Sequence, residues 1–185
     1  PSLVWKFYQN RRRQLLAVEP NPAHMAVAHL ESKCKSLVLV TQNVDDLHER
    51  GGSSAIIHMH GSLRSLRCQN TGLSEVRMGE HDLAEGFVFC NCCTVATMMR
   101  PDIVWFGEIP LEMSVIQKEV EDCEVFIVIG SSGHVYPAAG LVNLANSNGA
   151  HTILVNIELP INGRDFDEVH IGKAGEILPE LVENW

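Results

Sequence analysis

The run Val125-Phe126-Ile127-Val128-Ile129 leads directly into the turn Gly130-Ser131-Ser132-Gly133. A helical segment to about Asn148 and a second apolar run, Thr152-Ile153-Leu154-Val155, follow it. Short, continuous apolar runs rich in β-branched residues are typical of strands buried on both faces of a parallel sheet. Strand, glycine turn, helix and strand form one βαβ unit, whose strands pair in parallel. The sequence therefore predicts an α/β fold, with a Rossmann-like parallel sheet and helices on both faces.

Another apolar run, Leu37-Val38-Leu39-Val40, ends in the polar segment Thr41-Gln42-Asn43-Val44-Asp45-Asp46-Leu47-His48. Open α/β sheets bind ligands beyond the carboxyl ends of their strands, where Gln, Asn and Asp side chains can hydrogen-bond a polar ligand. A nearby histidine can transfer a proton near neutral pH. His58 and His60 occupy alternate positions of an extended segment and face opposite ways, so we expect only one of them to enter a site.

The remaining periodicity predicts further elements on both sides of these segments. Pro1 suits the first turn of a helix. The expected elements are helices at residues 2–17, 23–32 and 43–50, an extended piece at 55–57, a strand at 168–171 and a terminal helix from about residue 174.

Residues 62–100 differ from the rest of the chain in being polar and rich in cysteine. We expect them to form a small inserted, zinc-ribbon-like module in a Rossmann-like domain made of residues 1–61 and 101–185. Cys90-x-x-Cys93 lets two thiolates reach one metal ion, and Cys68 is a third candidate ligand. Cys92, His81 or water could complete the shell, and a weak or absent metal is the alternative. Cys34 and Cys123 are expected to be ordinary buried thiols.

The composition and net charge of the chain argue against nucleic acid and membranes as its partners. The chain has 185 residues, is 45% hydrophobic, and has a net charge of −9 and a pI near 5.4. An acidic protein is poorly suited to binding nucleic acid, and no apolar run is long enough to cross a membrane. Without a signal segment, we expect an intracellular protein. The acidic surface either attracts lysine-bearing protein segments or serves solubility alone.

Four motifs, in order along nearly the entire chain, together resemble the sirtuins, which are NAD-dependent protein-lysine deacylases. The family pattern T-Q-N-[IV]-D-x-L-H matches residues 41–48, and its H-G matches His60-Gly61. Its R-P-x-[IV]-V-x-F-G-E segment matches residues 100–108, and its G-[TS]-S turn with V-x-P-A matches residues 130–138.

The resemblance implies that the acyl group of a protein lysine is transferred to ADP-ribose while nicotinamide is released. His60 would be the general base, Asn43 and Asp45 would arrange NAD and water, and Gln42 would contact the ribose. The turn after the strand at 125–129 and the polar residues after the next strand would also bind NAD. The full set expected to bind the cofactor is Gln42, Asn43, Asp45, Gly130, Ser131, Ser132, Val135, Asn156 and Glu158.

The same resemblance implies a substrate site and a structural zinc. In the family, the segment that matches Val104, Trp105, Phe106, Gly107 and Glu108 pairs with the substrate peptide and lines the acyl-lysine tunnel, whereas a plain buried strand is the alternative. Sirtuins usually hold zinc with two C-x-x-C pairs, but Thr71 replaces the second cysteine of the first pair.

Tyr8 and Arg11 lie at i and i+3 of the first predicted helix and so share a face. In the sirtuin branch that removes succinyl and malonyl groups, a Y-x-x-R pair binds the acyl carboxylate, a ligand that suits arginine. The chain resembles this class III branch, of bacterial and mitochondrial type, which implies a cytoplasmic protein of bacterial type or a mitochondrial one in a eukaryote. A solvated cluster is the alternative for Arg11-Arg12-Arg13.

The family's N-terminal strand and its G-A-G-x-S-x-x-S-G-I-P-x-F-R loop, which contacts NAD, have no counterpart among these residues. The opening at Pro1 resembles that of a fragment, so we expect the 185 residues alone to bind NAD poorly and to be inactive or unstable. A non-catalytic NAD- or ADP-ribose-binding module and an NAD-dependent protein ADP-ribosyltransferase are the alternative functions. A dehydrogenase is disfavoured because no G-x-G-x-x-G turn occurs.

Overall fold

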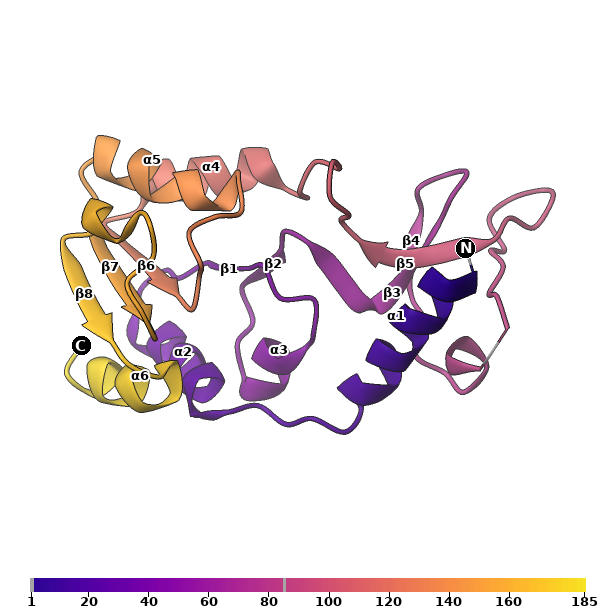
Figure 1. Ribbon diagram of the computed structural model, residues 1–185, viewed down its shortest axis with the longest axis horizontal. Coiled ribbons are helices and arrows are strands. Elements are labelled where there is room, and N and C mark those ends of the chain that lie inside the picture. The colour runs from indigo at the N-terminus through magenta and orange to yellow at the C-terminus, as the bar shows by residue number, and fades with distance from the viewer. Residues whose placement is uncertain (1, 85) are drawn as a thin grey trace. The chain divides into compact units, whose positions relative to one another are not determined.

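The computed structural model describes residues 2–84 and 86–185, so Pro1 and its predicted place in a helix lie outside the described residues (Figure 1). The chain forms two compact units. Unit 1 contains residues 2–19, 40–50 and 56–111, and unit 2 contains residues 20–39, 51–55 and 112–185. The first helix belongs to unit 1 because it contacts strands of the cysteine-rich part.

Unit 2 is built on a three-stranded parallel sheet. Its strands are β6 (Val125–Ile129), β7 (His151–Asn156) and β8 (Glu168–Ile171), in the order β6-β7-β8. Helices α4 (Met113–Asp122) and α5 (Leu141–Ser147) lie on one face. Helices α2 (Pro22–Lys33) and α6 (Ala174–Glu183) lie on the other, as Figure 1 shows. The structure thus confirms the predicted parallel sheet with helices on both faces.

The core of unit 2 lies between the sheet and helices α2 and α6. Val155 on the central strand is fully buried, and Leu178 and Val182 of α6 lie one helical turn apart. Asn21 starts α2, since its side-chain oxygen accepts the backbone N–H groups of Ala23 and His24. The other buried members of this core are Ala23, Ala26, Val27 and Leu30.

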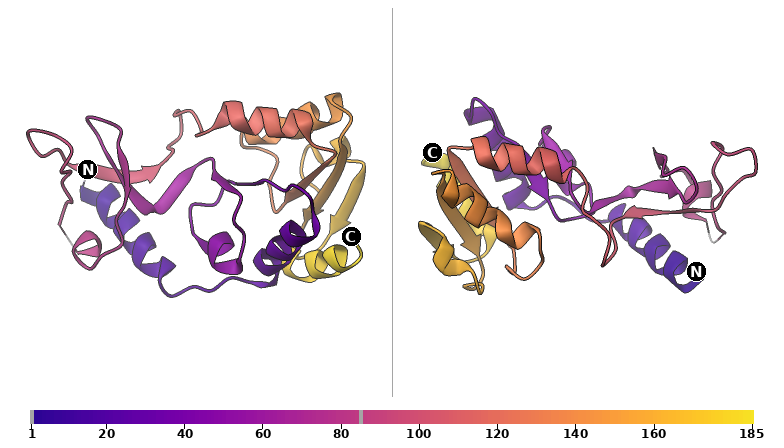
Figure 2. Two further views of the ribbon diagram at one scale, coloured as in Figure 1. Left: turned by 180° about the vertical axis from the view of Figure 1, so that it is seen from behind. Right: turned by 90° about the horizontal axis from the view of Figure 1, so that it is seen from above.

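Unit 1 contains an antiparallel sheet in the order β4-β3-β5, beside which helix α1 lies (Figures 1 and 2). The bounds are Ser2–Leu15 for α1, Gly61–Cys68 for β3, Ser74–Val76 for β4 and Met99–Ile103 for β5. Trp5 of α1 packs against Leu66 and Met99, and Leu15 packs against Leu63 and Ile103.

Shorter elements complete the described chain. Strands β1 (Leu39–Thr41) and β2 (Ile56–His58) form a two-stranded sheet, and helix α3 spans Leu47–Gly51. Three 3₁₀ turns occupy His81–Leu83, Ala138–Gly140 and Gly163–Asp165. Among the described residues, no helix is both long and apolar enough to cross a membrane.

The alternative of a solvated cluster for Arg11, Arg12 and Arg13 is wrong for Arg12. Its side chain is fully buried. Its guanidinium donates to the backbone carbonyls of Leu63, Asp82 and Arg77 and to the side chain of Gln9. Burial lowers the pKa of Arg12 to about 10, although the nearby Asp82 carboxylate opposes that shift. The residue therefore joins α1 to β3 and to the loop that follows β4.

Candidate active site and cysteine cluster

The polar segment after β1 is held in a defined turn of unit 1. Thr41 Oγ1 accepts the backbone N–H of Asn43 at 3.0 Å, and Asp45 Oδ1 accepts the N–H of Leu47 at 3.1 Å, at the start of α3. Asn43 is exposed, whereas Gln42 and Asp45 are half-buried. The segment thus presents an amide and a carboxylate at the surface of unit 1.

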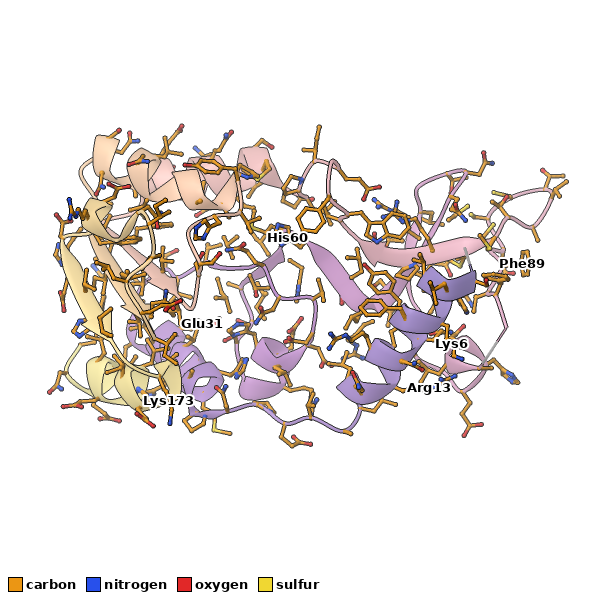
Figure 3. All side chains as sticks on the ribbon, in the orientation of Figure 1. Lys6, Arg13, Glu31, His60, Phe89 and Lys173 are labelled. Carbon is orange, nitrogen blue, oxygen red and sulfur yellow. The ribbon has the colours of Figure 1, made fainter. Side chains whose placement is uncertain are left out.

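His60 is half-buried in the connection between β2 and β3, where Figure 3 labels it. Its Nδ1 atom lies 3.2 Å from the carbonyl oxygen of Gln42. Because a carbonyl can only accept a hydrogen bond, Nδ1 carries the hydrogen, and Nε2 keeps the lone pair that a base needs. His58 has a different partner, since its Nε2 atom lies 2.8 Å from Glu49 Oε1. The two histidines are therefore placed for different roles.

The expected substrate segment begins beside His60. The backbone N–H of Val104 donates to the His60 carbonyl oxygen at 3.0 Å. Strand β5 ends at Ile103, and the chain then turns, with Gly107 at φ +90° and a bond from Glu108 N to Trp105 O. The alternative of a plain buried strand is wrong for these residues, because Phe106 is fully exposed and its neighbours from Trp105 to Glu108 are exposed as well.

Four side chains form a linked cluster next to this turn. Arg100 donates to both carboxylate oxygens of Glu108, at 2.6 and 2.9 Å, and these bonds are the main reason that the pKa of Glu108 falls to about 2. The guanidinium carbon of Arg100 lies 3.6 Å from the centroid of the Trp105 ring. The indole N–H of Trp105 donates to the hydroxyl of Tyr8 at 3.0 Å. The cluster thereby connects β5, the turn and α1.

Arg11 is exposed and lies three residues after Tyr8 on helix α1. Its guanidinium carbon is 5.5 Å from the centroid of the Phe7 ring. Within the described part of the chain, Arg11 forms no ion pair, so its charge is available to an anionic ligand.

The glycine turn of unit 2 is shaped for a polar ligand. Gly130 has φ +63°, and its N–H donates to the carbonyl oxygen of Val155. Within residues 2–84 and 86–185, the backbone N–H groups of Ser131 and Ser132 bond to no other group. Both remain available to a phosphate or ribose oxygen, which fits the expected dinucleotide.

Asn156 supports this turn. It is buried, its Nδ2 atom donates to the Ser131 carbonyl at 2.9 Å, and its Oδ1 atom accepts the N–H of Ile157 at 3.0 Å. The side chain of Asn156 is therefore already engaged in hydrogen bonds to the backbone, and these bonds compete with its expected contact with NAD. Glu158 and Val135 are exposed.

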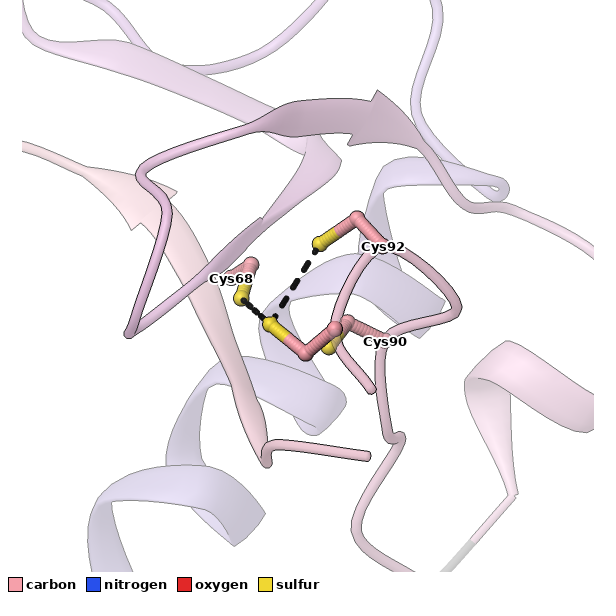
Figure 4. Close-up of side chains that lie close together, drawn as sticks. Cys68, Cys90 and Cys92 are labelled. Carbon is pink, nitrogen blue, oxygen red and sulfur yellow. Dashed lines mark hydrogen bonds between the residues drawn. The ribbon is translucent and has the colours of Figure 1, made fainter. Parts of the chain in front are cut away.

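The cysteine cluster brings together all three predicted metal ligands and Cys92. The four sulfur atoms lie within 4.8 Å of one another, and Figure 4 shows Cys68, Cys90 and Cys92 converging. The Sγ atoms of Cys68 and Cys93 are 3.6 Å apart, too far for a disulfide, and all four residues are thiols. Hydrogen bonds from Thr71 lower the pKa of Cys68 to about 6. Four sulfur donors at this spacing suit a structural zinc ion, and His81 does not belong to the group.

We expect Cys90→Ser to remove most of the bound zinc and to lower the thermal stability of the protein, because a structural zinc contributes directly to folding. Zinc content by elemental mass spectrometry and thermal unfolding followed by circular dichroism would measure both effects. Cys34→Ser, in unit 2, is the matched control and should leave the zinc content unchanged. Cys92→Ser should also lose zinc. An unchanged zinc content in that variant would contradict Cys92 as the fourth ligand.

The chain resembles known proteins over its whole length. The model of the Sir2 family matches residues 1–137. An NAD-dependent protein deacylase of Pasteurella multocida is 50% identical over 191 residues, which cover 100% of this chain and 79% of that protein.

Solved structures agree with these sequence matches. A Sir2 homologue in complex with NAD superposes with a TM-score of 0.92 at 38% identity, covering 100% of this chain and 72% of the other. A Sir2 protein bound to a myristoylated histone peptide gives a TM-score of 0.81 at 35% identity, covering 99% and 78%.

Proposed function

The chain belongs to the Sir2 family, and we propose that it is an NAD-dependent protein-lysine deacylase that accepts acetyl and acidic acyl groups such as succinyl and malonyl. The observation that carries this proposal is the environment of His60. Its Nδ1 bond to Gln42 leaves Nε2 free to take a proton, and its own carbonyl bonds the start of the expected substrate segment at Val104. These two contacts support His60 as a base beside a backbone segment that would pair with the substrate peptide.

We propose residues for this activity in each of the two units separately. In unit 1 we propose His60 as the general base, with Gln42, Asn43 and Asp45 arranging NAD and water. In unit 2 we propose the turn residues Gly130, Ser131 and Ser132, with Val135, Asn156 and Glu158, as NAD-binding. The free N–H groups of Ser131 and Ser132 support the assignment of the turn.

Bound NAD would supply the ribose C1′ carbon that the acyl oxygen attacks with loss of nicotinamide, and the ribose 2′-hydroxyl that accepts the acyl group. His60 would take the proton of the ribose hydroxyl at Nε2, while its Nδ1–H bond to Gln42 holds the ring in place. Val104 and its neighbours would position the acylated lysine by backbone pairing. Cys68, Cys90, Cys92 and Cys93 would hold a structural zinc ion, since their four sulfur atoms could supply all four of its ligands.

The direct test is to incubate the protein, as its gene encodes it, with NAD and acetyl- or succinyl-lysine peptides and to search for O-acyl-ADP-ribose by mass spectrometry. We expect this product together with free nicotinamide and unmodified lysine. Transfer of label from isotope-labelled NAD to protein, without that product, would support an ADP-ribosyltransferase instead. Calorimetric NAD binding without any product would support a non-catalytic binding module.

The relatives also suggest the substrates of the protein and its location in the cell. We propose acylated lysine side chains of proteins as substrates, because one Sir2 relative is bound to an acylated histone peptide. The bacterial relatives favour a cytoplasmic location.

For the acyl preference we propose that Tyr8 and Arg11 bind the acyl carboxylate. We expect Tyr8→Phe combined with Arg11→Met to reduce kcat/KM for a succinyl-lysine peptide by about 10²–10⁴-fold, and to reduce it far less for an acetyl-lysine peptide, because two charged hydrogen bonds are lost and each contributes about 1.5–3 kcal/mol. Steady-state assays on the two peptides would measure the ratio. Lys6→Met, which also removes a cation from α1, is the control and should keep the wild-type ratio. Equal losses for both peptides in the Tyr8 and Arg11 variant would contradict the assignment.

A further inference from the structure

The cluster of Glu108, Arg100, Trp105 and Tyr8 holds the indole of Trp105 from several directions. Glu108 accepts the backbone N–H of Trp105 at 2.8 Å, and the same carboxylate binds Arg100 with two hydrogen bonds. Arg100 also donates to the carbonyl oxygen of Ile103 at 2.6 Å, which ties its guanidinium to the end of β5. That guanidinium then covers the indole ring face. The indole is therefore fixed by its backbone and by one face of its ring.

The fixed indole of Trp105 donates a hydrogen bond to the hydroxyl of Tyr8. An indole N–H can only donate, so the hydroxyl of Tyr8 must be the acceptor in the 3.0 Å contact with Trp105. A tyrosine hydroxyl has one hydrogen, and steric exclusion by the indole N–H turns that hydrogen to the side away from Trp105. Within the described part of the chain, the Tyr8 hydroxyl has no other hydrogen-bond partner. Its hydrogen therefore remains available to a ligand.

The tyrosine ring is fixed as well. It packs against the cluster of Leu15, Leu63 and Ile103, and it meets the Phe7 ring edge-on at a centroid distance of 5.2 Å. Phe7 also lies under the guanidinium of Arg11. The O–H donor of Tyr8 and the charge of Arg11 thus sit on one face of α1 with no protein acceptor among the described residues, an arrangement that suits an anion.

We propose that Trp105 is a specificity-determining positioning residue, whose indole N–H fixes the Tyr8 hydroxyl as a donor to the carboxylate of an acidic acyl group. The inference deepens the proposed function and rests on it. Arg100 and Glu108 hold the indole in place. A neutral acyl group such as acetyl has no carboxylate to receive the Tyr8 hydrogen, so it gains nothing from this arrangement.

The test is Trp105→Phe, which keeps an aromatic ring beneath Arg100 and removes only the N–H donor and part of the ring. We expect the ratio of kcat/KM for succinyl-lysine to kcat/KM for acetyl-lysine to fall by about 3–10-fold, because a neutral hydrogen bond contributes about 0.5–1.5 kcal/mol. The succinyl loss should appear in KM rather than in kcat, as expected for binding that is equal in ground and transition states.

The double variant separates positioning from a general structural effect. If Trp105 acts through Tyr8, then adding Trp105→Phe to Tyr8→Phe should not change the succinyl-to-acetyl ratio further. A further fall of the ratio in the double variant, or equal losses for both peptides in the single one, would overturn the inference.

The inference can fail separately from the proposed function. If Tyr8→Phe lowers the ratio and Trp105→Phe leaves it at the wild-type value, the acyl-carboxylate site stands and the role of Trp105 is refuted. If Tyr8→Phe itself leaves the ratio unchanged, the acyl-carboxylate site is refuted and this inference with it, while detection of O-acyl-ADP-ribose still tests the deacylase activity.

Discussion

Replacing His60 with alanine is expected to reduce NAD-dependent deacylation by about 10²–10⁴-fold, the range typical of a lost general base. The structure provides the physical reason. The Gln42 carbonyl fixes the hydrogen on Nδ1 of His60, so that Nε2 is the acceptor, and alanine has no atom that can take the proton. The measurement is the rate of O-acyl-ADP-ribose formation from an acetyl-lysine peptide under saturating NAD.

His58→Ala is the matched control for this experiment. His58 lies two residues earlier but contacts Glu49, and its loss should affect stability slightly while most of the turnover remains. NAD binding, measured by calorimetry, should survive in the His60 variant, because the proposed role of this residue is proton transfer. Undiminished turnover in His60→Ala, or an equal loss in His58→Ala, would contradict the assignment of the base.

The parallel sheet of unit 2 was predictable because its signals are local. The apolar runs of β6 and β7 and the glycine turn between β6 and α5 each lie within a few residues, and the structure confirms both strands. Helix α4 was not predicted. Its start has no side-chain cap, Glu112 before it has φ 54°, and only Ile116 and Val120 of its residues are buried. A helix with no capping residue and so few buried positions is stabilised by tertiary packing, which cannot be read from the sequence.

Sequence motifs could propose residues for the candidate site, but they could not predict the tertiary contacts that surround those residues. The motif that contains His60 could be read from the sequence, but the bond from Nδ1 to Gln42, eighteen residues away, could not. The burial of Arg12 depends on carbonyl groups from Leu63 and the loop after β4, which are distant in sequence. Cys92 was left open as a ligand because its distance to Cys68 depends on how two turns approach each other.

Gly61→Ala is expected to have the largest effect on stability, lowering the free energy of unfolding by about 3–5 kcal/mol. Gly61 has φ +83°, a conformation that costs an L-residue about 1–2 kcal/mol. A methyl group there would also lie 2.0 Å from the backbone carbonyl oxygen of Asp102 on β5. A backbone atom in a paired strand cannot rotate away as a side chain can, so β3 and β5 would have to separate, and overpacking of this kind adds further cost. Urea unfolding followed by the fluorescence of Trp5 and Trp105, both in unit 1, measures the change.

Gly72→Ala separates the two contributions, because Gly72 also has a positive φ, of +75°, but a methyl group there would meet no atom within 4 Å. We expect a loss of about 1–2 kcal/mol in this control, which is the conformational cost alone. The difference between the two variants therefore measures the close approach of β3 to β5. Equal losses would contradict that explanation. Because Gly61 follows His60 directly, separation of the strands would also shift the proposed base, so Gly61→Ala should lose deacylation at temperatures where the variant is still folded.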